Sequence, residues 1–216
     1  MPDAIEKALT AALGDSTPIG EVLIQRTSGG GFTLCHRNDQ TKSELRSFRK
    51  PEDAIEIARY DDAGNYRPLK TAPNLRHGWR LEVLNLGELR QTLDHFYPGR
   101  LAMLASWQEN RLARTTLRDT LDRQSGMYRV AAKISDEQID DLVGSFCRSN
   151  GGCLRTILWK RDAGNAVPSS KLPREKFDPA HDQTGRGERA IPLLCQEACN
   201  LLVAACRKVV KGETNE

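Results

Sequence analysis

Residues 21–25 (EVLIQ) and residues 31–35 (GFTLC) form two short apolar runs, and Ser28-Gly29-Gly30 lies between them. Two such runs joined by a glycine-containing turn are typical of a β-hairpin. The glycines do not form a phosphate-binding loop, because they lack the following lysine and serine or threonine and link two strands instead of opening a helix. The sequence therefore predicts β-structure near the start of the chain.

Helical and strand patterns surround the hairpin. Residues 2–13 carry apolar side chains at four-residue spacing, and residues 51–55 begin with the proline and acids that suit the first turn of a helix. Residues 78–84 alternate like a strand with one buried face, and residues 86–96 place their leucines and phenylalanine on one helical face. Residues 101–107 are apolar, and both a helix and a buried strand fit them.

The last part of the chain is predicted to be mainly helical. Ser135 and Gln138 form a capping-box start for a helix that ends at Cys147. A loop of about 30 residues follows from Lys160, and loops of that length are usually functional or disordered. A final helix is expected from about residue 194 to residue 211. We expect an α+β protein with a mixed domain at residues 1–130 and a helical domain at residues 131–216.

The composition favours a folded protein in the cytoplasm. Hydrophobic residues make up 38% of the 216 residues, which is enough to bury a core. The net charge of +3 is too close to neutral to predict a nucleic-acid partner, and no apolar run reaches the ~18–20 residues that cross a bilayer. Residues 1–7 lack the basic start and the apolar stretch of a secretory signal.

Cysteine placement is the most informative feature for function. Five of the six cysteines follow residue 146, and in a reducing compartment such a cluster favours a metal site over disulfides. Cys147 and Cys153 are six residues apart, with two glycines between them that permit a tight loop. Cys195 and Cys199 are four residues apart, so on a helix they share one face.

Four thiolates suit either an iron–sulfur centre or a structural zinc ion. The wide spacing of the first pair and the lack of a neighbouring histidine favour a four-iron cluster, while zinc and simple buried thiols remain alternatives. His181 is the one candidate for a substituted ligand. Cys35 and Cys206 are interpreted as core thiols, Cys206 because it lies about 10 Å along a helix from Cys199.

Other residues are assigned roles around the metal centre. Trp159 is expected to shield a cluster from water, and Glu197 to bond to nearby amides or to pair with an arginine close to the first cysteine pair. His77 and His95 have no partner at ligand or triad spacing, so the sequence predicts no catalytic residues. Basic residues near the two pairs are expected to stabilise a reduced cluster: Arg148, Arg155, Lys160, Arg161, Arg189 and Arg207.

Residues 147–159 and 191–200 (IPLLCQEACN) resemble the iron–sulfur module attached to some CbiX-type sirohydrochlorin cobaltochelatases. Residues 69–79 (LKTAPNLRHGW) and 121–129 (LDRQSGMYR) resemble the stabilising domain that precedes this module. The resemblance implies that the four cysteines Cys147, Cys153, Cys195 and Cys199 bind one [4Fe-4S] cluster. It does not imply chelatase activity, because the chain is too short to hold the chelatase domains.

Two functions are therefore expected. The first is electron transfer or redox sensing by a [4Fe-4S] protein, linked to a chelatase-type partner in a tetrapyrrole or cobalamin pathway. The alternative is a structural cluster or a four-cysteine zinc site in a non-catalytic interaction module. An enzyme that uses the cluster as a Lewis acid is least favoured, because it needs an iron without a cysteine ligand. No nucleic-acid or membrane partner is expected, and the sequence does not define the oligomeric state.

Overall fold

The computed structural model of this chain describes residues 3–143, 147, 153–159 and 190–212. The chain divides into two compact units. Unit 1 contains Met1–Arg111 and Asp178–Leu193, and unit 2 contains Leu112–Phe177 and Leu194–Glu216. The loop expected from residue 160, and His181 within it, lie outside the described residues.

The units divide after Arg111, whereas the sequence analysis set the boundary near residue 130. The difference arises from the segment that follows Arg111. Helix α5 (Leu117–Asp122) packs on the 3₁₀ helix η2 (Gly126–Lys133), and η2 packs on α8 (Asn200–Lys211). Their apolar side chains, such as Leu117 and Leu121, are buried with those of α8, so this segment belongs to unit 2.

Unit 1 is built on a five-stranded sheet with the order β1-β2-β3-β5-β4. The three pairs β1–β2, β2–β3 and β3–β5 are antiparallel, and the short edge strand β4 is parallel to β5. The strands are β1 (Ser16–Ile19), β2 (Val22–Arg26), β3 (Phe32–His36), β4 (Arg46–Phe48) and β5 (Trp79–Val83).

The predicted hairpin is confirmed as β2 and β3. Ile24 pairs with Leu34, and Leu34 pairs with Leu81 of β5, so a row of buried side chains runs across the sheet. The turn closes where the amide of Thr27 donates to the carbonyl of Gly31 at 3.0 Å. Gly30 in this turn has a φ of 86°, a conformation that glycine adopts without strain.

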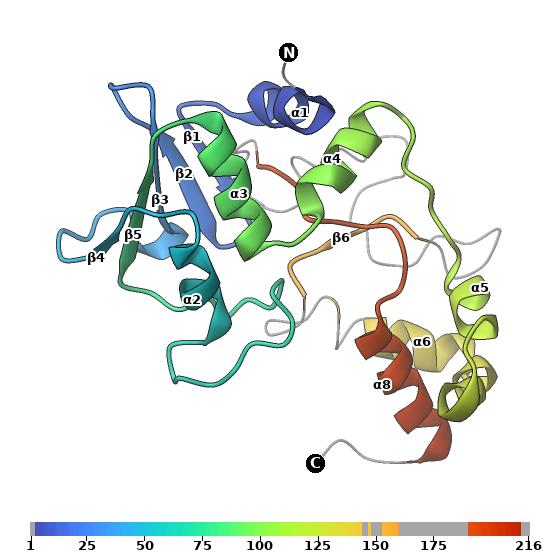
Figure 1. The fold of residues 1–216 in the computed structure, drawn as a ribbon. Coiled ribbons are helices and arrows are strands. Elements are labelled where there is room, and N and C mark those ends of the chain that lie inside the picture. The colour runs from blue at the N-terminus through green and yellow to red at the C-terminus, as the bar shows by residue number, and fades with distance from the viewer. Residues whose placement is uncertain (1–2, 144–146, 148–152, 160–189, 213–216) are drawn as a thin grey trace. The chain divides into compact units, whose positions relative to one another are not determined.

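Helices bury their apolar faces against the sheet and against one another. Figure 1 shows α2 and α3 over the same face of the sheet, and the ring of Phe96 on α3 stacks on Trp79 of β5 at 5.1 Å. Residues 101–107, for which a strand also fitted the sequence, are helical. The helices of unit 1 are α1 (Ala4–Ala12), α2 (Asp53–Arg59), α3 (Leu86–Phe96) and α4 (Arg100–Gln108).

A segment from late in the chain extends this sheet. Ile191 forms a parallel bridge with Ile19, and its amide donates to the carbonyl of Pro18 at 2.8 Å. Gly20, which follows Ile19 in the chain, has a φ of +55°, and a Cβ there would lie 2.6 Å from the hydroxyl of Tyr97. A side chain at Gly20 therefore has neither the space nor the backbone conformation that it needs.

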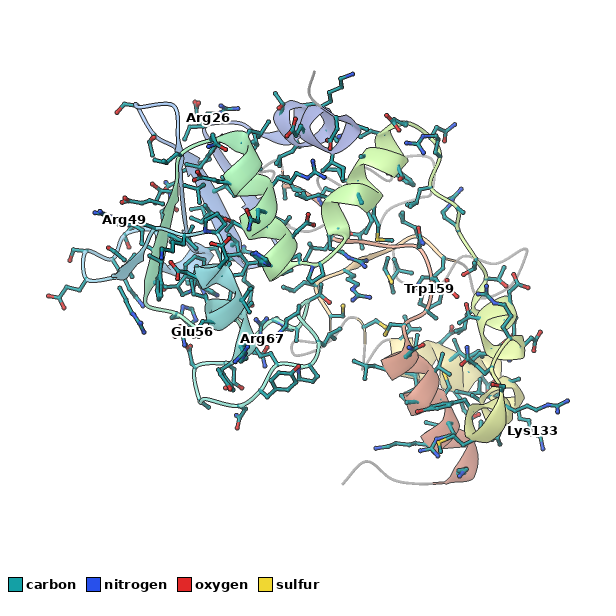
Figure 2. All side chains as sticks on the ribbon, viewed as in Figure 1. Arg26, Arg49, Glu56, Arg67, Lys133 and Trp159 are labelled. Atoms are coloured by element: carbon teal, nitrogen blue, oxygen red, sulfur yellow. The ribbon has the colours of Figure 1, made fainter. Side chains whose placement is uncertain are left out.

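A buried arginine holds the connection between α2 and β5. Arg67 is 2% exposed, and its guanidinium donates to the carbonyl of Ala72 at 2.8 Å and to the side chain of Asn74 at 2.8 Å (Figure 2). Because these oxygens accept its N–H groups, the buried charge does not stay unsatisfied. This connection carries the pocket described below.

Unit 2 is mainly helical. Its core is formed by α5, η2, α6 (Asp136–Leu142) and α8, with a two-stranded parallel sheet of β6 (Thr156–Ile157) and β7 (Leu194–Cys195). The predicted capping box at α6 is confirmed, because Ser135 accepts from the amide of Gln138 and Gln138 bonds back to Ser135. A mixed sheet unit and a helical unit make the fold α+β, as predicted. None of the helices among the described residues is long and apolar enough to cross a bilayer.

Candidate metal centre

Cys195 lies in a strand, not in a helix. It pairs with Ile157 across the β6–β7 sheet, and its carbonyl accepts from the amide of Leu158 at 2.9 Å. The prediction that the final helix begins near residue 194 is therefore wrong, as is the shared helical face of Cys195 and Cys199. The pairing with β6 keeps residues 194–195 in an extended strand, and the helix begins only at Asn200.

Cys199 is the N-cap residue of α8. Its backbone is extended, with φ −78° and ψ 160°, and its carbonyl accepts the first helical bond from Val203 at 3.1 Å. Its side chain makes no capping bond. The sulfur therefore sits at the positive end of a twelve-residue helix, where the helix dipole stabilises a negatively charged ligand.

The first cysteine pair closes a short loop. The amide of Cys153 donates to the carbonyl of Cys147 at 3.4 Å, so the two cysteines, which are six positions apart, are joined by a backbone hydrogen bond. Both side chains are partly buried, and Cys147 packs against the core of unit 2. Residues 148–152, and with them Arg148, lie outside the described residues.

All four cysteines belong to unit 2, and three of them contact one apolar core. Cys195 is part of that core, Cys147 and Cys199 pack against it, and Cys153 is close enough to Cys195 to disfavour a second thiolate there. All six cysteines of the chain lie in the described part, and no disulfide bond joins any two of them there. The assignment of the four as ligands stays a prediction.

Burial keeps the thiol of Cys195 neutral. It is 7% exposed, and burial raises its pKa, while Arg155 and Trp159 act in the opposite direction. The S–H group donates to the carbonyl of Glu197 at 3.3 Å. A metal that binds here must therefore displace a proton.

The surroundings of Cys195 fit an iron–sulfur group. Trp159 is 3% exposed, and its indole Nε1 has no hydrogen-bond partner within the described structure. An unpaired buried donor costs about 1–3 kcal/mol. Thiolates and sulfides provide the acceptor that this donor lacks, and a neutral thiol provides only a weak one.

Glu197 and Cys206 have structural contacts. Glu197 pairs with Arg123 and accepts from the hydroxyl of Thr120 at 3.5 Å, which fixes the β7–α8 connection to α5. The arginine that pairs with it thus comes from α5 and not from the first cysteine pair. Cys206 is fully buried in α8, and burial raises the pKa of its thiol to about 11. Cys35 is buried in β3, so both thiols are core residues as predicted.

Unit 1 contains a histidine cluster that the sequence analysis missed. The rings of His36 and His77 lie 3.7 Å apart, and Nδ1 of His77 lies 3.4 Å from Oδ1 of Asp39. The ligand atoms of these three residues lie within 4.8 Å of one another. His77 is 38 residues from Asp39 in the chain, so no short sequence motif contains both residues and predicts that they meet.

Other groups already occupy the ligand atoms of this cluster. Lys42 pairs with Oδ1 of Asp39 at 2.6 Å, and the amide of Gly78 donates to Oδ2 at 2.6 Å. Nδ1 of His36 accepts from the amide of Asn38 at 3.1 Å, which leaves the ring proton on Nε2. The cluster therefore holds the end of β3 to the start of β5 and is not prepared for a metal ion.

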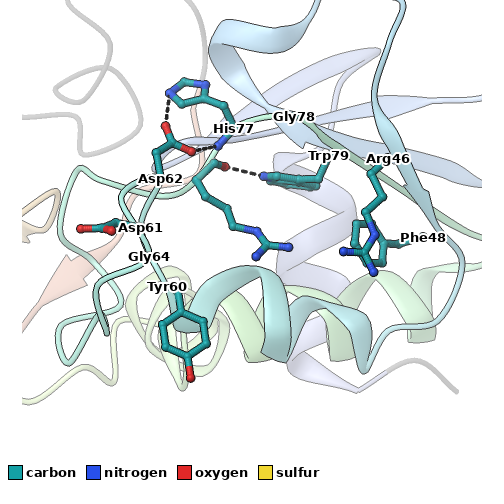
Figure 3. Close-up of a pocket in the computed structure, with 10 residues that line it drawn as sticks. Arg46, Phe48, Tyr60, Asp61, Asp62, Gly64, His77, Gly78 and Trp79 are labelled. Carbon is teal, nitrogen blue, oxygen red and sulfur yellow. Dashed lines mark hydrogen bonds and ion pairs between the residues drawn. The ribbon is translucent and has the colours of Figure 1, made fainter.

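A cavity of about 480 Å³ lies beside this cluster (Figure 3). Its lining mixes both charge signs, with Arg46 and Asp62, and aromatic rings, with Phe48 and Tyr60. Asp62 accepts from the amide of His77 at 2.6 Å, so this part of the wall is bonded to itself. The mixed charges do not define one class of ligand.

A mixed sheet unit and a helical unit that contains five of the six cysteines define a two-unit α+β protein. Residues 4–111 match the family of the DR2241 stabilising domain, and residues 109–208 match the family of a 4Fe-4S iron-sulfur cluster binding domain. The chain therefore belongs to the DR2241 stabilising domain family, and residues 109–208 are similar to the 4Fe-4S iron-sulfur cluster binding domain. The two matches meet at residues 109–111, where the two units divide.

A solved structure is similar over almost the whole chain. It is DR2241 from Deinococcus radiodurans, described as a multi-domain protein with structural similarity to chelatases and two additional novel domains. The identity is 28% and the TM-score 0.73, over 98% of this chain and 43% of that one. The present chain thus spans less than half the length of that protein. No curated protein matches the chain. These matches confirm the resemblance drawn from the sequence.

Proposed function

We propose that this chain binds one [4Fe-4S] cluster through Cys147, Cys153, Cys195 and Cys199 and carries electrons, or senses redox state, for a chelatase-type partner. The observation that carries the proposal is the position of the four cysteines. They lie in one compact unit, at or beside one core, within residues that match a 4Fe-4S binding domain. When bound, such a cluster supplies a one-electron couple.

Each ligand has a defined structural role in this proposal. Cys195 is held by the β6–β7 pairing, and Cys199 is held at the positive end of α8. The Cys147–Cys153 loop supplies the other two sulfurs. Trp159 and Ile157, both buried in the same core, exclude water from the side of the cluster that faces Cys195, and water exposure is one of the factors that set a cluster's potential.

Loading of the cluster is coupled to proton release. The thiol of Cys195 is neutral in the metal-free chain, because burial raises its pKa. Its proton must leave before the sulfur binds iron, so the affinity for the cluster rises with pH until the thiol ionises unaided.

The partner is proposed from the similar structure. DR2241 joins chelatase-like structure to two further domains, and the present chain corresponds to 43% of it. We propose that a chelatase of a tetrapyrrole or cobalamin pathway is a separate partner of this chain. A reducing cytoplasm is the proposed location, since no disulfide bond joins any of the six cysteines in the described structure.

Anaerobic purification tests the cluster. Iron, sulfide and zinc are measured in the wild type and in four single variants, Cys147→Ser, Cys153→Ser, Cys195→Ser and Cys199→Ser. Paramagnetic resonance is recorded on the reduced samples. We expect four irons and four sulfides per chain in the wild type, as in the matched domain, and loss of the intact cluster in each variant.

Cys206→Ser and Cys35→Ser are the matched controls, because both thiols are buried without a proposed ligand role. Both are expected to keep the wild-type iron content. Stoichiometric zinc in place of iron would establish the alternative structural zinc site, and a cluster that survives all four ligand substitutions would refute the assignment.

A second experiment tests the redox role. Binding of the cluster-loaded chain to a chelatase-type protein is measured in the oxidised and the dithionite-reduced states. We expect a reversible one-electron couple and a difference in affinity between the two states. A cluster that cannot be reduced, or identical affinities, would leave a purely structural cluster.

A further inference from the structure

The starting observation is an unpaired donor in the core of unit 2. Trp159 is 97% buried. Its indole Nε1 lacks a hydrogen-bond partner among the described residues. An unsatisfied N–H destabilises a buried core, and phenylalanine at this position would fill similar space without that cost. The indole therefore points to an acceptor that arrives with a bound group.

Strand geometry places this donor beside Cys195. Residues directly opposite each other in a sheet point to the same face, so Ile157 and Cys195 share one face. Ile157 and Trp159 are both buried in the core that contains Cys195, whereas Leu158 between them is not part of that core, so Trp159 lies on the same side of the chain as Ile157. Diagonal neighbours in a sheet are within reach of long and aromatic side chains.

We propose that Trp159 is a positioning residue that donates its indole N–H to the sulfur of Cys195 in the cluster-loaded protein and so raises the reduction potential of the cluster. This inference rests on the proposed function. Reduction adds an electron to the centre and increases the negative charge on its sulfurs. An N–H group at one of those sulfurs stabilises the reduced state more than the oxidised state.

The test compares Trp159→Phe with the wild type and with Trp107→Phe. Trp107 is a partly exposed residue of α4 in unit 1, so its substitution is the matched control. Potentiometry is monitored by paramagnetic resonance. We expect unchanged iron content and a more negative potential in Trp159→Phe, by up to a tenfold change in the one-electron equilibrium constant, or about 59 mV. Trp107→Phe should keep the wild-type potential.

A spectroscopic measurement on the loaded wild type supports this comparison. Tryptophan labelled with ¹⁵N in the indole ring is incorporated, and electron–nuclear double resonance is recorded on the reduced cluster in H₂O and in D₂O. We expect a ¹⁵N coupling and an exchangeable proton that both disappear in Trp159→Phe. If that variant fails to hold iron, site-specific 3-benzothienylalanine at position 159 replaces it, because this analogue keeps the ring shape and lacks the N–H.

The outcomes separate this inference from the proposed function. A wild type without iron refutes both. A loaded wild type that shows no ¹⁵N coupling, or a loaded variant with the wild-type potential, refutes the role of Trp159 and leaves the cluster assignment intact. A lower potential without any loss of the exchangeable proton would show that ring packing, and not the N–H, sets the potential.

Discussion

Unit 1 and unit 2 are stabilised in different ways. Unit 1 closes its core with large apolar side chains on a five-stranded sheet, and Leu34, Leu81 and Phe96 are at most 1% exposed. Unit 2 joins short helices to a sheet of two-residue strands. Its core contains the thiols Cys195 and Cys206 and an indole without an acceptor.

The buried polar groups of the two units also differ. In unit 1 carbonyl oxygens accept from Arg67 and both oxygens of Asp39 accept hydrogen bonds, although the ring Nε2 of His95 has no partner among the described residues. In unit 2 three of the four proposed ligands are only partly buried, namely Cys147, Cys153 and Cys199. We therefore expect unit 1 to be stable by itself and unit 2 to depend on its bound group.

Removal of the cluster is the strongest way to test this contrast. A structural metal contributes about 10–16 kcal/mol in small metal-dependent domains, so its loss should exceed the effect of any single side-chain change. We expect residues 147–199 to become protease-sensitive and α8 to lose amide protection, while the sheet of unit 1 keeps its own. Hydrogen exchange with and without an iron chelator measures both units together. Equal protection of unit 2 in the two states would break the comparison.

Truncation of the sheet core should have the opposite pattern. Leu34→Ala removes a fully buried side chain from the row that joins β2, β3 and β5, and we expect a loss of about 2–5 kcal/mol. The iron content of the folded fraction should not change, because the four proposed ligands lie in unit 2. Urea denaturation measures the free energy of unfolding. Leu84→Ala, at a position that is 79% exposed, is the control and should change it by less than about 0.5 kcal/mol.

The buried carboxylate of unit 1 provides a pH-dependent test. Burial raises the pKa of Asp39, but the bonds from Lys42 and Gly78 outweigh burial and hold that pKa below its usual value of 3.8. A lowered pKa stabilises the folded state above the unfolded-state pKa, and that stability is lost as the pH falls through the folded-state value. We expect Asp39→Asn to destabilise unit 1 by about 1–3 kcal/mol at pH 7.

The difference between Asp39→Asn and the wild type should shrink as the pH falls below 3.8, because the carboxyl of the unfolded state then binds a proton while that of the folded state is still ionised. Urea denaturation from pH 7 down to pH 3 follows it. A difference that stays constant over this range would mean that packing, and not charge, accounts for the effect.

An exposed ion pair of unit 2 should give the smallest effect. Arg123 and Glu197 are 57% and 39% exposed, so water screens their attraction, and Arg123→Gln is expected to cost less than about 1 kcal/mol. Iron content should stay at the wild-type value. Thermal unfolding of the loaded protein checks this. A loss of iron would show that the pair positions the β7–α8 connection for ligand binding.

Local patterns predicted much of unit 1. The hairpin, the strand at β5 and the helix α3 follow from periodicities of two and 3.6 residues, which neighbouring residues alone determine. The capping box at Ser135 is also local, and the structure has it. These features depend on residues within one turn or one strand of each other, so a single sequence contains them.

Pairing between distant segments was not predictable in the same way. Cys195 is in a strand because residues 156–157 lie beside residues 194–195, and the sequence around Cys195 reads equally well as the start of a helix. His77 meets Asp39 only because β5 lies next to β3. The unit boundary after Arg111 likewise depends on where α5 packs, which no local signal reports.

The bridge between Ile19 and Ile191 has a consequence for synthesis of the chain. The two residues are 191 − 19 = 172 positions apart, so β1 has no neighbour on its outer edge until most of the protein has left the ribosome. An uncovered edge strand presents unpaired amides and carbonyls to other nascent chains. Residues 190–193 thus act as a late cover, and translation that stops before them releases a sheet able to pair with its own copies.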